Sequence, residues 1–182
     1  EGGRLTVGPD SSGAVPGPAS YGRGGPLSLT DCHVLLGRLV PERLPLAFGP
    51  RGDSALDPAV VRECFAALAD RVAAANGGGA GAEALAEGFL TVAVDTMANA
   101  IKHVSLTHGH DPAHFALACF GGAGPQLACR VAEALGIGTI VIHPLAGVLS
   151  AVGIGLAEPR SVRRGTLGRA LDAAGLAAAE AL

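Results

Sequence analysis

The segment FALACFGGAGPQLACRVAEAL, residues 115–135, limits the possible folds more than any other part of the chain. An apolar run reaches the glycines Gly121, Gly122 and Gly124, and a helical pattern begins at Pro125. A short apolar run predicts a buried strand, and proline suits the first turn of a helix because its missing N–H would be unpaired anyway. The segment is therefore predicted to be a strand-to-helix turn.

The elements around this turn predict an α/β fold. TIVIH, residues 139–143, is typical of a second strand, and GVLSAVGIGLA, residues 147–157, of a second helix. The order strand, helix, strand, helix implies a parallel sheet with a crossover connection. Upstream, Asp57 as cap and Pro58 in the first turn predict a helix that runs to about Asn76.

The longest predicted helix covers residues 83–108. Its apolar residues recur every three or four positions and form one stripe, which consists of Leu90, Val94, Met97, Ile101 and Val104. Residues 6–26 contain too many glycines and prolines for a helix or a regular strand. After this loop, Thr30 is predicted to cap a short helix.

The composition argues against nucleic-acid binding and against a membrane span. The net charge is −3 and only 3% of the residues are aromatic, so neither a basic surface nor a base-stacking platform is expected. Residues 136–157 contain no charged side chain, but His143 and Pro144 divide them into two short elements. The four cysteines form no CxxC pair and are expected to be reduced thiols of the core, which suits a cytoplasmic protein.

A glycine-rich turn before a helix is a common place for a phosphate or a ribose. The missing side chains allow close approach, and the helix N-terminus offers N–H donors and a positive dipole end. The Walker A pattern is absent because no GK[ST] follows, and the dinucleotide fingerprint fails because Leu127 stands at its third glycine. From spacing alone, an ordinary tight turn remains an equal alternative.

Two stretches, ACFGGAGPQLACRVAEALGI and the later GVLSAVGIGLAE, resemble the hydantoinase A/5-oxoprolinase family. The upstream stretches VGPDSSGAVPGPASYGRGGPLSLTDCHVLLGRL, FGPRGDSALDP and GFLTVAVDTMANAIKHVSLTHGHDP resemble the same family in the expected order. GHDPAHFALACFGGAG resembles the single-chain 5-oxoprolinase branch in particular. The resemblance covers most of residues 5–158, whereas residues 159–182 match poorly.

This resemblance implies an actin-like, sugar-kinase-like ATPase fold of the ribonuclease H-like class. Its members couple ATP hydrolysis to the opening of a cyclic amide such as 5-oxoproline or a hydantoin, with Mg²⁺ and in some members a potassium-type ion. Gly121, Gly122, Ala123 and Gly124 match the turn that packs against the adenosine and α-phosphate. The resemblance further implies a hydantoinase B-type subunit or domain as partner, an oligomer, and a place in glutathione metabolism.

The family's phosphate-binding segments lie upstream of the residues that this chain matches. We therefore expect residues 1–158 to be the downstream part of the hydantoinase A/5-oxoprolinase domain, and residues 159–182 to be the truncated start of the next segment. The upstream half of the same polypeptide is then the first expected partner. The isolated chain is expected to show no ATP-dependent lactamase activity.

The catalytic residues are not identified by the sequence, and two carboxylates are weak candidates. Asp31 could bind substrate or metal, but beside a helix start a capping role is the alternative. Asp95 could act from the long helix, but a solvated helix face is the alternative. Four histidines, His103, His108, His110 and His114, straddle a helix end without HExxH spacing, so no metal site is expected.

Departures from the family pattern leave three functions open. Ser20 replaces a common cysteine, Cys32 and His33 replace an Ala-Asn pair, and Val94 and Asn99 replace Asn and Arg. The chain is interpreted first as a fragment of an ATP-dependent cyclic amide hydrolase. The alternatives are a subunit of a related ATP-dependent ketone carboxylase and a non-catalytic nucleotide-binding scaffold.

Overall fold

The computed structural model describes residues 5–162, 166, 168–170 and 172–180. The chain divides into two compact units, Glu1–Gly147 and Val148–Leu182, which are called unit 1 and unit 2 below. Unit 2 contains α5 (Leu149–Leu156) and α6 (Ala173–Glu180). Unit 1 contains all other helices and strands named here.

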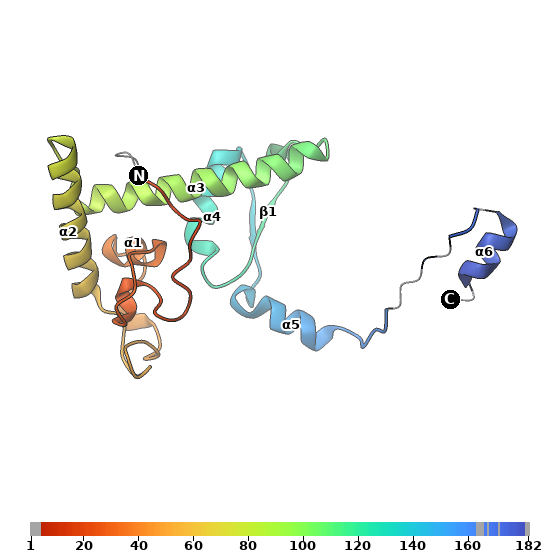
Figure 1. Cartoon of the computed structure of the whole chain (residues 1–182), viewed down its shortest axis with the longest axis horizontal. Coiled ribbons are helices and arrows are strands. Elements are labelled where there is room, and N and C mark those ends of the chain that lie inside the picture. The colour runs from red at the N-terminus through yellow and green to blue at the C-terminus, as the bar shows by residue number, and fades with distance from the viewer. Residues whose placement is uncertain (1–4, 163–165, 167, 171, 181–182) are drawn as a thin grey trace. The chain divides into compact units, whose positions relative to one another are not determined.

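Unit 1 is built around one long helix, α3 (Figure 1). Its helices and strands are, in chain order, η1 (Ala19–Tyr21), α1 (Leu29–Leu35), η2 (Pro41–Arg43), α2 (Pro58–Asn76), α3 (Ala82–Thr107), η3 (Pro112–His114), β1 (Leu117–Cys119), α4 (Pro125–Leu135) and β2 (Ile140–Ile142). Helices α1, α2 and α4 all pack against α3. The helices predicted from Asp57 to about Asn76 and over residues 83–108 are therefore confirmed.

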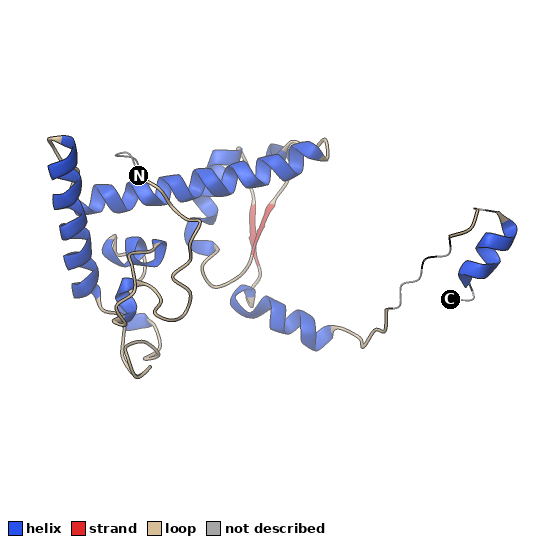
Figure 2. Ribbon diagram, viewed as in Figure 1, coloured by secondary structure: helices blue, strands red, loops and turns tan. Residues whose placement is uncertain are grey.

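The predicted parallel sheet is confirmed, although its strands are short. β1 and β2 pair in parallel, with Leu117, Ala118 and Cys119 opposite Ile140, Val141 and Ile142 (Figure 2). The strand predicted from residue 115 starts two residues later, at Leu117, because Phe115 caps η3 by donating its N–H to the Pro112 carbonyl. The predicted second helix is α5, and His143 and Pro144 lie between it and β2, as expected.

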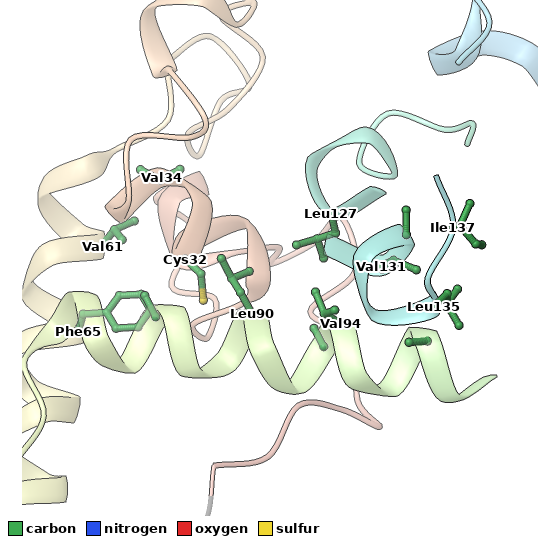
Figure 3. Packing of buried hydrophobic residues seen from close by; sticks show 14 of the residues in the cluster. Cys32, Val34, Val61, Phe65, Leu90, Val94, Leu127, Val131, Leu135 and Ile137 are labelled. Atoms are coloured by element: carbon green, nitrogen blue, oxygen red, sulfur yellow. The ribbon is translucent and has the colours of Figure 1, made fainter. Parts of the chain in front are cut away.

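The core of unit 1 lies where α1, α2 and α4 meet α3. Phe65 of α2, Cys32 of α1 and Leu90 of α3 are at most 2% exposed, and Val131 of α4 is 5% exposed (Figure 3). The side of α3 that faces this core carries small residues, Ala86, Ala93 and Ala98, among the larger ones. Small side chains let the neighbouring helices approach closely.

The apolar stripe of α3 is buried only over part of its length. The buried residues of this helix run from Leu85 to Ala98, whereas Met97 is 36% exposed and Val104 60% exposed. By length and composition α3 is also the one described helix that could cross a bilayer, but its apolar side packs in the core. The stripe thus predicted the helix correctly and its burial only in the N-terminal half.

Two local predictions are wrong. Helix α1 is capped by Ser28 and not by Thr30, because Asp31, three residues after Ser28, reaches back to the Ser28 backbone N–H at 2.8 Å. All four cysteines are free, but only Cys32 is buried and Cys129 is exposed, because it points away from the α3-facing side of α4. Burial, and next the negative charge of Asp31, raise the pKa of the Cys32 thiol to about 12.

One glutamate of α3 links α4 and the segment after α1, beside a buried histidine. Glu87 of α3 pairs with Arg38, which follows α1, and with Arg130 of α4, each at 2.8 Å. His33 of α1 is only 3% exposed, and its Nδ1 atom has no hydrogen-bond partner among the described residues. Burial lowers the pKa of His33, and the positive charges of Arg38 and Arg130 lower it further.

Because folding keeps His33 neutral, we expect the fold to lose stability as the pH falls below neutral. Folding holds His33 neutral, so below the unfolded pKa of 6.5 the unfolded chain binds a proton that the folded chain does not. The free energy of unfolding should decrease from neutral pH to about pH 5.5. Denaturant titrations across this pH range measure the effect. In His33→Asn the free energy of unfolding should depend less on pH than in wild type, whereas the exposed control His103→Gln should show the wild-type pH dependence. An equal slope in wild type and His33→Asn would contradict the assignment.

Candidate functional site

The glycine-rich turn joins the end of β1 to the start of α4. Gly121 has a left-handed backbone with φ of 88°, and its N–H donates to the carbonyl of Ala146 at 2.8 Å. Gly124 is the N-cap residue of α4, and Pro125 is the first helical residue. The predicted helix start at Pro125 is confirmed.

The three glycines of this turn differ in why they are needed. A Cβ atom at Gly124 would lie 2.7 Å from the Phe120 carbonyl oxygen. Gly121 has a positive φ, which is strained for any residue with a side chain. A Cβ at Gly122 would meet nothing within 4 Å, and its φ is not left-handed. The fold therefore explains Gly121 and Gly124 but gives no reason for a glycine at 122.

Open space at Gly122 lies next to the N-terminus of an eleven-residue helix. Gly122 and Ala123 are exposed, and α4 begins two residues after Ala123. In α4, Pro125 has no N–H, and the N–H groups of Gln126 and Leu127 donate to the carbonyls of Ala123 and Gly124, so the positive end of the helix dipole is what the first turn offers an anion. The turn therefore combines a surface without side chains with a local preference for negative charge.

An apolar cavity of about 350 Å³ lies beside the same turn. α3, β1 and α4 form its walls, and Phe120 and Gly124 belong to the lining. Its other lining residues are Met97, Ala100, Ile101, Leu117, Ala118, Cys119, Leu127, Ala128 and Val131. This surface suits an apolar or aromatic group.

Asp31 has a structural role. Its carboxylate accepts hydrogen bonds from the backbone N–H groups of Ala19 at 3.1 Å, Ser20 at 2.8 Å and Ser28 at 2.8 Å, and from the Ser28 hydroxyl at 3.0 Å. The residue is fully buried. Four donors occupy the acceptor sites that a substrate or a metal would need. The structure therefore favours the capping alternative for Asp31.

The remaining polar candidates do not converge on the turn. Asp95 and Asn99 are exposed on α3, as the solvated-face alternative predicted. Ser20 is fully buried, and its hydroxyl has no hydrogen-bond partner among the described residues. Within the described part of the chain, no group of three or more His, Cys, Asp or Glu side chains is placed to hold a metal ion.

The sequence model for Hydantoinase/oxoprolinase matches residues 1–163. The chain belongs to the hydantoinase/oxoprolinase family. It is 43% identical over 162 residues to 5-oxoprolinase 1 of Arabidopsis thaliana and 44% identical over 156 residues to 5-oxoprolinase of Saccharomyces cerevisiae. Each alignment covers 86% of this chain but only 13% and 12% of the relative, so the chain spans about an eighth of these family members.

Two solved structures contain a similar fold. The ATP-dependent caprolactamase of Pseudomonas jessenii matches 83% of this chain and 20% of its own, with a TM-score of 0.68 and 33% identity. A nucleotide-free acetone carboxylase matches 82% of this chain and 20% of its own, with a TM-score of 0.65 and 26% identity. The α/β arrangement of unit 1 thus recurs in both.

Paired substitutions of the two candidate carboxylates should separate their roles. Asp31→Asn should lower the free energy of unfolding by about 3 kcal/mol. In wild type the buried carboxylate accepts hydrogen bonds from several N–H groups, whereas the amide of Asn would point its own N–H donor at some of them. Asp95→Asn, the matched exposed control, should change it by less than about 0.5 kcal/mol. Chemical denaturation measures both. Equal, small effects would show that the Asp31 hydrogen bonds contribute little.

The glycines of the turn should also respond differently to alanine. Gly121→Ala should cost about 1 kcal/mol or more, because alanine must adopt a left-handed backbone. Gly122→Ala should cost less than about 0.5 kcal/mol, because the added methyl group enters open space. Thermal unfolding of the two variants tests this. A larger loss for Gly122→Ala than for Gly121→Ala would contradict the described turn.

Proposed function

We propose that the full-length protein is an ATP-dependent hydrolase of cyclic amides such as 5-oxoproline or a hydantoin. In this proposal unit 1 is part of an actin-like ATPase unit, and residues 121–124 form the adenosine-side wall of its nucleotide cleft. The observation that carries the proposal is Gly122, because the fold does not require a glycine at this position. Family membership and the ATP-dependent caprolactamase neighbour support it.

The residues of the turn fit a nucleotide. Gly122 and Ala123 present a surface with little side-chain bulk, and the α4 N-terminus favours an anion. The apolar cavity formed by Met97, Ile101 and Phe120, among others, offers a surface for an aromatic or apolar group. ATP, when bound, supplies the phosphoryl group that activates an amide, which resonance otherwise protects from water.

The described residues of this chain supply only part of such a site. Phosphoryl transfer depends on positioning and on neutralising charge, normally with Mg²⁺. We assign no described residue to Mg²⁺, because among the described residues no three His, Cys, Asp or Glu side chains are grouped to hold a metal ion. The proposed task of this chain is to position the nucleotide, while other parts of the polypeptide hold the phosphates and ions.

The wider assembly belongs to the same proposal. The curated relatives are about eight times longer than their matched segment, which supports further domains in the same polypeptide. A hydantoinase B-type domain or subunit, an oligomer, a cytoplasmic location and a role in glutathione metabolism follow from the family resemblance.

A related ketone carboxylase is the second candidate, favoured by the acetone carboxylase neighbour. Incubating the full-length protein with ATP and either a cyclic amide or acetone plus bicarbonate separates the two. Phosphate release with amide ring opening would support the hydrolase, and carbon fixation would support the carboxylase. ATP binding without either reaction would support the third interpretation, a non-catalytic nucleotide-binding scaffold.

Substitution of Gly122 should weaken ATP binding without unfolding the protein. In the full-length protein, Gly122→Val should raise the Kd for ATP about tenfold or more, because its branched side chain fills the open side of the turn. Gly138→Val is a matched control, because Gly138 also has an open Cβ position and no left-handed φ but lies before β2. Isothermal titration with thermal unfolding measures both. Unchanged ATP affinity in a folded Gly122→Val variant would contradict the assignment of residues 121–124 to the wall of the nucleotide cleft.

A further inference from the structure

One edge of β1 faces away from its strand partner. Among the residues that the structure describes, β1 has one neighbouring strand, β2, and the Leu117 N–H donates to the Thr139 carbonyl on that side at 2.9 Å. Peptide groups of successive residues in a strand point to opposite sides, so those of Ala118 point away from β2. This side of β1 is called its outer edge below, and such an edge can pair with a further strand.

The apolar cavity of about 350 Å³ lies along this outer edge. Its lining includes four consecutive residues, 117–120, which come from both faces of β1, but no residue of β2. A cavity that touches both faces of one strand, and not the strand paired with it, lies beside the unpaired edge. α3 forms the opposite wall with Met97, Ala100 and Ile101, and α4 contributes Leu127, Ala128 and Val131. The cavity is therefore a groove between a strand edge and a helix.

The groove and the sheet beside it are apolar but only partly covered. No charged side chain belongs to the lining that the structure describes. Leu117 packs against the core, whereas Phe120 is 62% exposed and Val141 of β2 is 54% exposed. Parallel strands are normally buried on both faces, and a sheet of two strands is smaller than the usual sheet. The exposed apolar side chains and the outer edge thus favour an additional strand over a solvated surface.

We propose that the groove holds a β-strand of the full-length polypeptide from outside residues 1–182, paired with the outer edge of β1. Main-chain hydrogen bonds to Ala118 fix such a strand, and its alternate side chains, which are apolar, contact Met97, Ile101 and Val131. The occupant is assigned to the same polypeptide because the curated relatives are about eight times as long as the segment that they share with this chain.

This inference goes beyond the proposed function and does not depend on it. Gly122 and Ala123 are not part of the groove lining, so a strand in the groove leaves the proposed nucleotide wall open. The apolar groups that fill the cavity are then side chains of the strand, and the nucleotide contacts the turn. A strand parallel to β1 would end beside this turn, and ligands of open α/β sheets bind at the carboxyl ends of the strands.

Hydrogen–deuterium exchange of single amides in the full-length protein, without ATP, tests the strand pairing. The Leu117 amide is bonded to Thr139 in either case and serves as the internal reference. The Ala118 amide should exchange within about tenfold of the Leu117 rate, because the added strand accepts its hydrogen bond. Exchange of Ala118 more than about a hundredfold faster than Leu117 would overturn the proposal.

A groove-filling substitution tests the location. Ala100 is exposed in this structure and lines the groove, so Ala100→Trp should displace the strand and speed exchange of the Ala118 amide at least about tenfold. Ala74→Trp is a matched control, because Ala74 is an exposed alanine of α2 outside the lining, and it should change nothing at Ala118. A protected Leu117 amide shows that each variant is folded. Unchanged Ala118 exchange in folded Ala100→Trp would contradict the assigned groove.

Photo-cross-linking identifies the occupant even if Ala100→Trp does not fold. The photoreactive amino acid p-benzoylphenylalanine replaces Met97, which is 36% exposed and lines the groove, in a mixture of isotopically light and heavy full-length protein. The expected product is a link within one chain to a peptide from outside residues 1–182. A link between light and heavy chains would assign the groove to a second copy. Links confined to residues 1–182, no link, or a link that ATP abolishes would also overturn the proposal.

The outcomes are independent of the proposed function, because these experiments need neither a substrate nor turnover. If the strand is found and no amide is opened, the groove assignment stands and the hydrolase fails. If amides are opened with ATP but Ala118 exchanges rapidly, the hydrolase stands and the groove assignment fails.

Discussion

The buried carboxylate of Asp31 holds together the part of unit 1 that has least regular structure. It accepts hydrogen bonds from Ala19 and Ser20 of η1, inside the Gly- and Pro-rich loop, and from Ser28 at the start of α1. The Ser20 carbonyl in turn accepts from the N–H of Asp57, the residue that caps α2. Loop, α1 and α2 are thus joined through a few buried polar contacts, and this arrangement positions the side chains that pack against α3.

The elements that depend on local chemistry were predictable from the sequence. Asp57 and Pro58 define the start of α2, Pro125 defines the start of α4, and the apolar pattern of residues 83–108 defines α3. In each case the deciding contact lies within one helical turn. Neighbouring residues therefore contain the necessary information.

Features that depend on distant contacts were not predictable. Asp31 forms a local capping box with Ser28, but its bonds to the N–H groups of Ala19 and Ser20, which lie over ten residues earlier, have no local signal in the sequence. The exposure of Val104 and of Cys129 depends on which faces of α3 and α4 other elements cover. At the glycine turn, the sequence could not separate glycines required by the backbone from the one at 122, because that distinction needs φ angles and neighbouring atoms.

The central claim is that the turn between β1 and α4 contacts a nucleotide in the full-length protein. Hydrogen–deuterium exchange with and without ATP tests it directly, because it reports contact at this turn even if other segments bind the phosphates. The account predicts that ATP slows exchange of the backbone amides over residues 121–127, where the turn enters α4. Unchanged exchange there, with ATP bound and protecting amides elsewhere, would contradict it.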